Sequence, residues 1–151
     1  MLKTRLLHPE ILRALASSGH FSQVLVADCN YPVASHCGPN ATKVFLNLCP
    51  GIASTSDVLA VLVATIPVQG AALMQLPSGE SAALHEEYLA MLPPEATVTK
   101  LERSAFYEAV RSPLTTLVIA TGETRRFANV LLTMGVVKLE GVRHPRRPEA
   151  P

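Results

Sequence analysis

The sequence of 151 residues has no tryptophan, and aromatic residues make up only 5% of it. Charged residues are also sparse, at 17%, and they nearly cancel to a formal net charge of +1. Proteins that bind nucleic acids rely on basic surfaces, and those that bind single strands also stack bases on aromatic side chains. The composition therefore predicts no nucleic-acid partner, and the near-neutral charge gives no reason to expect binding to a membrane surface.

Cysteine is rare, and long hydrophobic runs are missing. The three cysteines are Cys29, Cys37 and Cys49. An odd number without a Cys-x-x-Cys pair argues against a disulfide framework and against a structural zinc site. The apolar run 58–66 is far too short to cross a bilayer, and the first residues lack the apolar stretch of a secretory signal. We therefore expect a cytoplasmic protein.

Hydrophobic residues, by contrast, are plentiful. They make up 48% of a chain that has the length of one ordinary domain, which is enough for a sizeable core. From residue 140 onward the composition changes to proline and arginine. We expect residues 1–139 to form the domain and residues 140–151 to be a disordered tail.

Short apolar runs alternate with helix-like segments along this domain. Residues 23–27 and 114–121 are rich in β-branched residues and indicate buried strands, while Ser54–Asp57 offers helix N-caps and Gly19 suits a helix end. This alternation predicts an α/β domain, a three-layer sandwich in which helices cover both faces of a parallel or mixed central sheet. The expected strands are 23–27, 43–48, 71–76, 97–101 and 114–121, and the expected helices are 9–18, 58–65, 81–91, 105–110 and 124–132.

Ligands of such sheets bind beyond the carboxyl ends of the strands. Asp28 directly follows the first expected strand, and residues 47–50 and 121–123 follow two others. His20 precedes the first strand, and an imidazole can exchange a proton near neutral pH. Arg103 stands at the start of an expected helix, where its charge opposes the helix dipole. Each residue also has a plain structural explanation, as a helix end, a turn former or a solvated surface residue.

The sequence supports a nucleotide site or a metal site less well than it supports the residues named above. Gly122 could let a phosphate approach a helix start, but Glu123 would repel it, and no glycine-rich phosphate-binding motif is present. Thiol and imidazole groups in the loop 29–40 could bind a metal, yet their spacing matches no zinc pattern. We expect neither cofactor nor metal. The metal candidates are Cys29, His36 and Cys37, and His85 and His144 are interpreted as solvated residues.

Several short motifs follow one another in a fixed order over nearly the whole chain. They are MLKT at 1–4, HPE at 8–10, GH at 19–20, AD at 27–28 with YP at 31–32, AFYE at 105–108, TGE at 121–123, and ANVLL at 128–132 with GV at 135–136. In this order they resemble the RbsD/FucU family, the D-ribose pyranases and L-fucose mutarotases.

The resemblance implies an α/β fold that assembles into rings, often decamers, with a sugar site at a subunit interface. It also implies a monosaccharide mutarotase or pyranase that interconverts anomers or ring forms by acid/base catalysis. It assigns the catalytic acid to His20 and sugar binding to Asp28, Arg103 and the triplet Phe127, Ala128 and Asn129.

One position departs from the family pattern. Phe127 replaces a tyrosine and has no hydroxyl, so it can neither donate nor accept a proton. His36, Tyr31 or water could replace that hydroxyl. A non-catalytic monosaccharide-binding protein of the same fold is therefore the alternative function, and a protein that keeps the fold only for assembly is a third.

Overall fold

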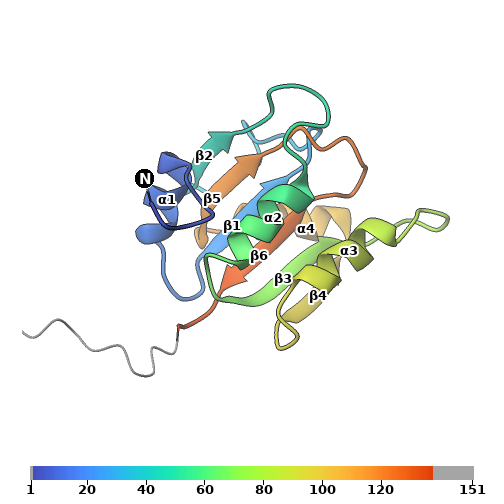
Figure 1. Ribbon diagram of the computed structural model, residues 1–151. Coiled ribbons are helices and arrows are strands. Elements are labelled where there is room, and N and C mark those ends of the chain that lie inside the picture. Colours follow the sequence, from blue (N-terminus) through green and yellow to red (C-terminus); the bar gives the residue numbers. More distant parts are fainter. Residues whose placement is uncertain (1, 138–151) are drawn as a thin grey trace, which may run out of the picture.

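The described part of the chain, residues 2–137 of the computed structural model, is built around a six-stranded sheet (Figure 1). The order of the strands across the sheet is β2-β5-β1-β6-β3-β4. Neighbours in the sheet are therefore mostly distant in the sequence, as expected of an α/β fold. The strands are β1 (Gln23–Ala27), β2 (Thr42–Phe45), β3 (Val68–Met74), β4 (Thr97–Leu101), β5 (Thr115–Ala120) and β6 (Val130–Met134).

The sheet is mixed, which is one of the two predicted forms. β1 and β2 both pair with β5 in parallel, and β3 pairs with β4 in parallel. β6 lies between β1 and β3 and is antiparallel to both. Five strands therefore point the same way, their carboxyl ends share one edge of the sheet, and β6 begins at that same edge.

The predicted helix 124–132 is wrong: residues 124–129 contain a turn and no helix, and residues 130–132 belong to strand β6. Val130, Leu131 and Leu132 are all buried, as they lie between β1 and β3 with both faces of the sheet covered. A central strand of this kind lacks the alternation of a half-exposed strand, so its apolar run cannot be distinguished from a buried helix by pattern.

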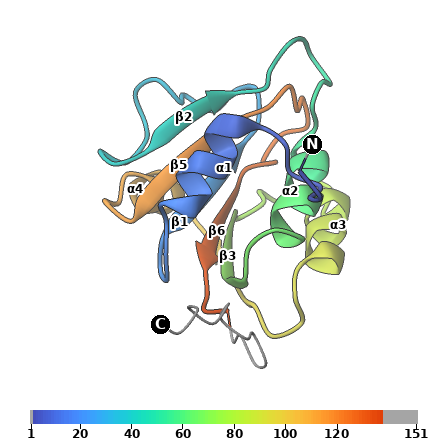
Figure 2. The same cartoon turned by 60° about the vertical axis from the view of Figure 1, so that its left-hand side comes forward.

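Helices cover both faces of the sheet, which confirms the predicted three-layer arrangement (Figure 2). Side chains alternate along β1: Val24 and Val26 pack on one face, and Leu25 and Ala27 on the other. The first face is covered by three helices and the second by one. They are α1 (Pro9–Ala16), α2 (Thr55–Val63) and α3 (Ala83–Met91) on the first face, and α4 (Arg103–Val110) on the second.

The predicted helix bounds differ from the observed ones by up to three residues at the starts and by up to two residues at the ends. Ser54 caps α2, and Ser54 and Asp57 form a reciprocal capping box, as the sequence indicated. α1 ends at Ala16, earlier than predicted, and the residue with left-handed backbone that follows it is Phe21, with φ of 67°, rather than Gly19.

Two further expectations concern membranes and the tail. Among the helices of residues 2–137, none has both the length and the hydrophobicity needed to cross a bilayer. The tail 140–151, including His144, lies outside the described residues, so its predicted disorder stays a prediction.

Candidate functional site

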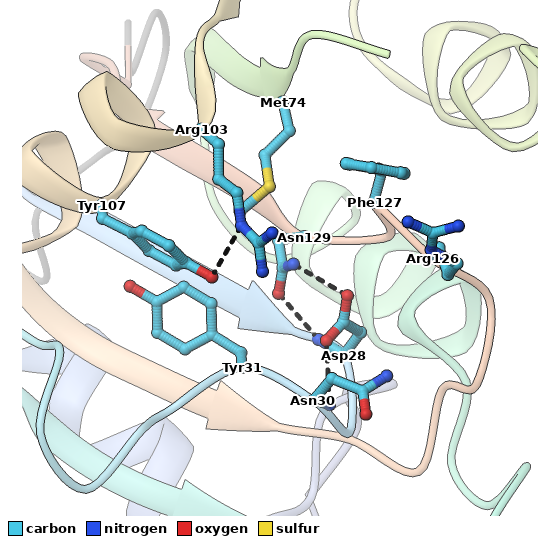
Figure 3. A pocket seen from close by; sticks show the side chains of 9 residues that line it. All are labelled: Asp28, Asn30, Tyr31, Met74, Arg103, Tyr107, Arg126, Phe127 and Asn129. Carbon is cyan, nitrogen blue, oxygen red and sulfur yellow. Dashed lines mark hydrogen bonds between the residues drawn. The ribbon is translucent and has the colours of Figure 1, made fainter. Parts of the chain in front are cut away.

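A cavity of about 320 Å³ opens at the edge where the five parallel carboxyl ends meet (Figure 3). This volume lies at the small end of the range for small-molecule sites. Its walls come from the segment after β1, the end of β3, the start of α4 and the segment before β6. The lining residues are Asp28, Asn30, Tyr31, Met74, Arg103, Tyr107, Arg126, Phe127 and Asn129.

Asp28 and Asn129 form a fixed pair at the bottom of the cavity. The Asn129 amide nitrogen donates to Asp28 Oδ2 at 2.8 Å, and the Asn129 amide oxygen accepts from the Asp28 main-chain N–H at 2.9 Å. The Asn30 main-chain N–H donates to Asp28 Oδ1 at 3.0 Å. Asp28 follows β1 and Asn129 precedes β6, so the antiparallel pairing of these strands brings the two side chains together.

The environment of Asp28 changes its acidity. The side chain is only 5% exposed, and burial raises the pKa of its carboxyl group. The hydrogen bonds from the Asn30 main chain and the Asn129 side chain oppose this rise but do not cancel it. A carboxylate with so little hydration is a strong acceptor for a ligand hydroxyl.

Arg103 and Tyr107, from the first and second turns of α4, form the opposite wall (Figure 3). The Arg103 Nε–H donates to the Tyr107 hydroxyl at 3.4 Å, and the guanidinium lies 5.8 Å from the centre of the tyrosine ring. This hydrogen bond raises the pKa of Arg103, so the side chain stays charged. Arg103 therefore presents a positive, hydrogen-bond-donating group to the cavity.

Two tyrosine hydroxyls belong to the cavity wall, and they differ in what they can do. The Tyr31 hydroxyl donates to the His36 carbonyl at 2.9 Å, and burial raises the pKa of Tyr31, so its proton is held in the protein. The Tyr107 hydroxyl accepts from Arg103 and donates to no atom of residues 2–137. Its proton is therefore available to a ligand.

Phe127 lies across the cavity from Tyr107 in an unusual backbone conformation. Its φ is 58°, in the left-handed region that residues other than glycine seldom adopt. The Arg126 guanidinium lies 5.2 Å from the Phe127 ring centre and pairs with Glu80 at 2.9 Å. Ala128 is fully buried, so of the predicted triplet Phe127 and Asn129 line the cavity and Ala128 does not.

His20 is not brought together with these residues. It lies before β1, at the opposite edge of the sheet, where its Nε2 is 3.0 Å from the Gln69 side-chain oxygen and its ring stacks on Phe21. β1 has five residues, so roughly 15 Å of strand separates His20 from Asp28. His20 is exposed and cannot reach a ligand held by Asp28 of the same chain.

Two other sequence expectations change in the structure, and the space beside Gly122 is filled. His85 is not solvated but buried, at 2% exposure, and its Nε2 lies 3.0 Å from the Phe127 carbonyl oxygen. Glu123 does not begin a helix; it is buried and paired with Arg125 at 2.7 Å. Gly122 admits no phosphate, because the carbonyl oxygens of loop 49–52 occupy the space beside it.

The metal candidates do not form a cluster. Within residues 2–137 there is no group of three or more His, Cys, Asp or Glu side chains placed to hold a metal ion. Cys29, Cys37 and Cys49 are free thiols. His36 instead contacts Ser35 through Nδ1, at 2.9 Å, and packs edge-on against Tyr107.

The structure adds five lining residues to the predicted sugar-binding set; of these, Tyr31 was expected only as a possible replacement for the missing hydroxyl at position 127. Asn30 and Tyr31 directly follow Asp28, and Tyr107 stands four residues after Arg103, one helical turn away. That spacing was a usable signal for Tyr107. Met74 and Arg126 had none, because a methionine at a strand end and an arginine in a turn have ordinary structural explanations. The five residues are Asn30, Tyr31, Met74, Tyr107 and Arg126.

Comparisons with known sequences agree on one family. The sequence profile of the RbsD / FucU transport protein family matches residues 1–137. A D-ribose pyranase from Variovorax paradoxus is 35% identical over 142 residues, which cover 90% of this chain and 98% of that protein. A fucose mutarotase from Homo sapiens is 34% identical over 148 residues, which cover 89% and 92%.

Solved structures of the family have the same fold. Bacillus subtilis RbsD in complex with D-ribose superposes with a TM-score of 0.79 over 91% of this chain and 99% of that one, at 24% identity, a likeness of fold alone. The fucose mutarotase of Streptococcus pneumoniae in complex with L-fucose has a TM-score of 0.72 and 28% identity over 90% and 99% of the two chains.

Proposed function

The chain belongs to the RbsD/FucU family, and on that premise we propose that it is a sugar isomerase, a mutarotase or pyranase acting on a monosaccharide such as fucose or ribose. The observation that carries this proposal is the cavity in which Asp28, Asn129, Arg103 and Tyr107 converge. Relatives named D-ribose pyranase and fucose mutarotase, similar over about nine-tenths of the chain, support it.

The cavity suits the binding of a small polyhydroxylated ligand. Asp28 accepts hydrogen bonds from sugar hydroxyls, while Arg103 donates to sugar oxygens. The Phe127 ring covers an apolar face of the sugar. Because unpaired buried polar groups are costly, a sugar that lacks a matching hydroxyl binds less well. Discrimination between sugars then comes from the hydroxyls that they present.

The reaction needs only proton transfers. When the ring opens, the bond between the anomeric carbon and the ring oxygen breaks and the ring oxygen takes up a proton. The anomeric hydroxyl loses its proton as the carbonyl forms, so no net proton is consumed. Positioned acid and base groups each contribute about 10²–10⁴-fold to such reactions. In this chain the Tyr107 hydroxyl has a proton that it can donate to a sugar in the cavity. The family pattern assigns the role of general acid to the imidazole of His20.

We place His20 in the cavity of a neighbouring copy of the chain. Both the cavity edge and the His20 edge of the sheet are accessible, and they lie at opposite ends of β1. Opposite, different surfaces that meet between copies make a head-to-tail contact, and repeated contacts of this kind form a ring when the rotation between copies closes. A ring of ten copies is our specific proposal, and the three free thiols support a location in the cytoplasm.

A second candidate function is sugar binding without catalysis, and Phe127 is the observation that favours it. It lines the cavity where the family pattern has a tyrosine. In that case the variant Phe127→Tyr gains at least tenfold in sugar exchange. If it gains nothing, the missing hydroxyl at this position is not what limits the rate.

Saturation-transfer NMR of anomeric protons tests the proposed function. It is applied to a panel of pentoses and 6-deoxyhexoses with wild type and His20→Ala. We expect wild type to speed exchange for at least one sugar and His20→Ala to lose at least about 100-fold of that rate. Broadened sugar signals without faster exchange support the binding protein, and no effect on any sugar refutes both functions.

A further inference from the structure

Behind the cavity wall, helix α3 holds the backbone of the segment that carries Phe127 and Asn129. His85 Nε2 lies 3.0 Å from the Phe127 carbonyl oxygen, and the Tyr88 hydroxyl donates to the Ala128 carbonyl oxygen at 2.8 Å. Two successive carbonyl groups of the site are therefore fixed by two side chains of one helix. Neither side chain lines the cavity.

The His85 ring stacks on the Tyr88 ring and makes its hydrogen bond to the Phe127 carbonyl through Nε2. Because the Phe127 carbonyl can only accept, Nε2 must carry a proton and donate this bond. Nδ1 is buried and has no hydrogen-bond partner among residues 2–137. A buried polar atom without a partner is unfavourable, and such atoms are rare in folded proteins. An apolar residue would avoid this cost, so the bond from Nε2 is the feature that distinguishes histidine here.

Tyr88 has a matching arrangement one turn further along α3. It is fully buried, and burial raises the pKa of its hydroxyl, so the group remains protonated and acts as a donor. Its oxygen also contacts the Thr55 hydroxyl from α2. The donor to Ala128 is thus held in place by the packing of α2 against α3.

These two bonds act on the residues that form the cavity. Phe127 has its left-handed φ of 58°, which is unfavourable for a side chain with a Cβ and persists only where surrounding contacts enforce it. Asn129, two residues later, holds both the carboxylate and the main-chain N–H of Asp28. A change in the 127–128 backbone therefore moves one cavity wall and loosens the Asp28 contact.

We propose that His85 is a positioning residue of the sugar site, which fixes Phe127 and Asn129 in their binding conformation by donating a hydrogen bond to the Phe127 carbonyl. The inference rests on the proposed function, since it assigns the cavity to a monosaccharide. It predicts that the loss of this bond lowers the fraction of molecules whose site is formed before the sugar arrives.

Such a loss has a distinct kinetic signature. When the competent conformation is only partly populated, the apparent dissociation constant rises by the inverse of its population, while saturating sugar restores that conformation. KM therefore rises and kcat stays nearly unchanged. A variant that is merely less stable behaves differently, because a smaller amount of folded protein lowers the apparent kcat and leaves KM unchanged.

The experiment compares three α3 variants with wild type by concentration-dependent exchange of the best sugar in the NMR panel. We expect His85→Leu to raise KM and the sugar dissociation constant about tenfold with kcat within about twofold. His85→Gln, whose amide can donate from the same position, stays within about threefold of wild type. Leu84→Ala is the matched control: it is buried on the same helix, does not contact the 127–129 segment by hydrogen bonds, and lowers Tm without changing KM.

A sugar-free readout keeps the two proposals separable. The Asp28 amide donates to Asn129, so its hydrogen exchange reports on the conformation of the segment without any ligand. We expect His85→Leu to speed exchange of this amide at least tenfold and to leave the Val26 amide in β1 unchanged. This result supports the positioning role of His85 even if no sugar in the panel binds. In that case the proposed sugar isomerase function is refuted and the positioning role is not.

Tyr88→Phe serves if His85→Leu does not fold, because it removes one hydroxyl and keeps the ring. We expect a rise in KM of severalfold and faster exchange of the Asp28 amide. The inference is overturned if the folded His85 and Tyr88 variants both keep the wild-type KM and Asp28 amide exchange, or if Leu84→Ala raises KM as much as His85→Leu does.

Discussion

At the scale of single residues, the site depends on a carboxylate that the fold makes less acidic. Burial raises the pKa of Asp28, and the Asn129 side chain is one of the groups that opposes this rise. The ionised form, which accepts hydroxyl protons, is the one that Asn129 stabilises. The pair therefore sets the lowest pH at which Asp28 can bind a sugar as a carboxylate.

Asn129→Ala is expected to raise the pKa of Asp28 further, because the ionised carboxylate loses the hydrogen bond that the Asn129 amide donates to it. The ionised form is then lost at a higher pH, so the acid limb of sugar exchange moves upward. A carbon-13 NMR titration of the Asp28 carboxyl measures the pKa directly. Asn30→Ala is the control, because Asn30 holds Asp28 through its main-chain N–H, and it should leave the titration unchanged. A pKa that falls or stays constant in Asn129→Ala contradicts this assignment.

Some residues of the site could be selected from the sequence, but the contacts between them could not. Asp28 and Arg103 could be selected because one follows a strand and the other begins a helix, and both line the cavity. His85 was misplaced on the surface, since an isolated histidine that is followed by two glutamates carries no sign of burial. Its partner is a main-chain carbonyl 42 positions away, which no local pattern encodes.

At the scale of elements, the connection from β5 to β6 is held by packing against the loop 49–53. The Gly51 N–H donates to the Gly122 carbonyl at 2.6 Å, and the Gly122 N–H donates to the Ala53 carbonyl at 2.9 Å. A Cβ on Gly122 would overlap the carbonyl oxygens of Cys49 and Ile52. This close approach of two backbones explains why glycine follows Thr121.

Gly122→Ala is therefore expected to lower the free energy of unfolding by about 2 kcal/mol, as overpacking of rigid surroundings does. Thermal or urea unfolding measures the loss. Gly19→Ala is the matched control, because nothing lies within 4 Å of a Cβ there and its backbone is not left-handed. Equal stability of the two variants would show that the loop 49–53 yields readily to the added methyl group.

The connection from β5 to β6 also contains an acid-sensitive ion pair between Glu123 and Arg125. Arg125 donates through Nε and Nη2 to the two carboxylate oxygens of Glu123, at 2.9 and 2.7 Å, and these bonds lower the pKa of Glu123 to about 2. A lowered pKa stabilises the folded state above the ordinary pKa of a glutamate, and this contribution is lost as the pH falls towards 2. The connection is thus held most firmly above about pH 5.

Glu123→Gln tests this electrostatic contribution. At pH 7 the variant is expected to unfold about 2 kcal/mol more easily than wild type, since it loses charged hydrogen bonds to a half-exposed Arg125. The difference should shrink between about pH 5 and pH 2, where wild-type Glu123 takes up its proton. Urea unfolding at several pH values measures it, and a difference that does not vary with pH would rule out the ion pair as its source.

Most strands could be predicted from the sequence, but β6, which follows this connection, could not. Strands β1, β4 and β5 were predicted nearly to the residue, because each is a short β-branched run with clear ends. β6 was assigned to a helix, since Val130–Met134 is buried on both faces and its pairing with β1 and β3 is long-range. The antiparallel insertion of β6 places Asn129 beside Asp28, so the missed strand is also what assembles the site.

At the scale of the whole molecule, the layers follow from the sequence but the assembly does not. Alternating elements suffice to predict helices on both faces of a sheet. No periodicity states how copies meet, and the proposed ring came from the family resemblance. The structure adds a geometric reason for it: the imidazole of His20 and the carboxylate of Asp28 lie at opposite edges of one sheet, so a site that uses both needs two copies.

A mixing experiment decides whether the site is shared between copies. His20→Ala and Arg103→Ala both change exposed side chains, so each variant should fold, and each alone should lose most sugar exchange. If a site takes His20 from one copy and Arg103 from the next, random assembly of equal amounts pairs two intact contributions in about one site in four. The two variants, unfolded together and refolded, should then recover about a quarter of the wild-type exchange rate, while each refolded alone keeps only its own low rate. If the mixture is no more active than the separate variants, His20 takes no part, because it cannot reach the cavity of its own chain. The proton would then have to come from the cavity itself, with Tyr107 as its donor.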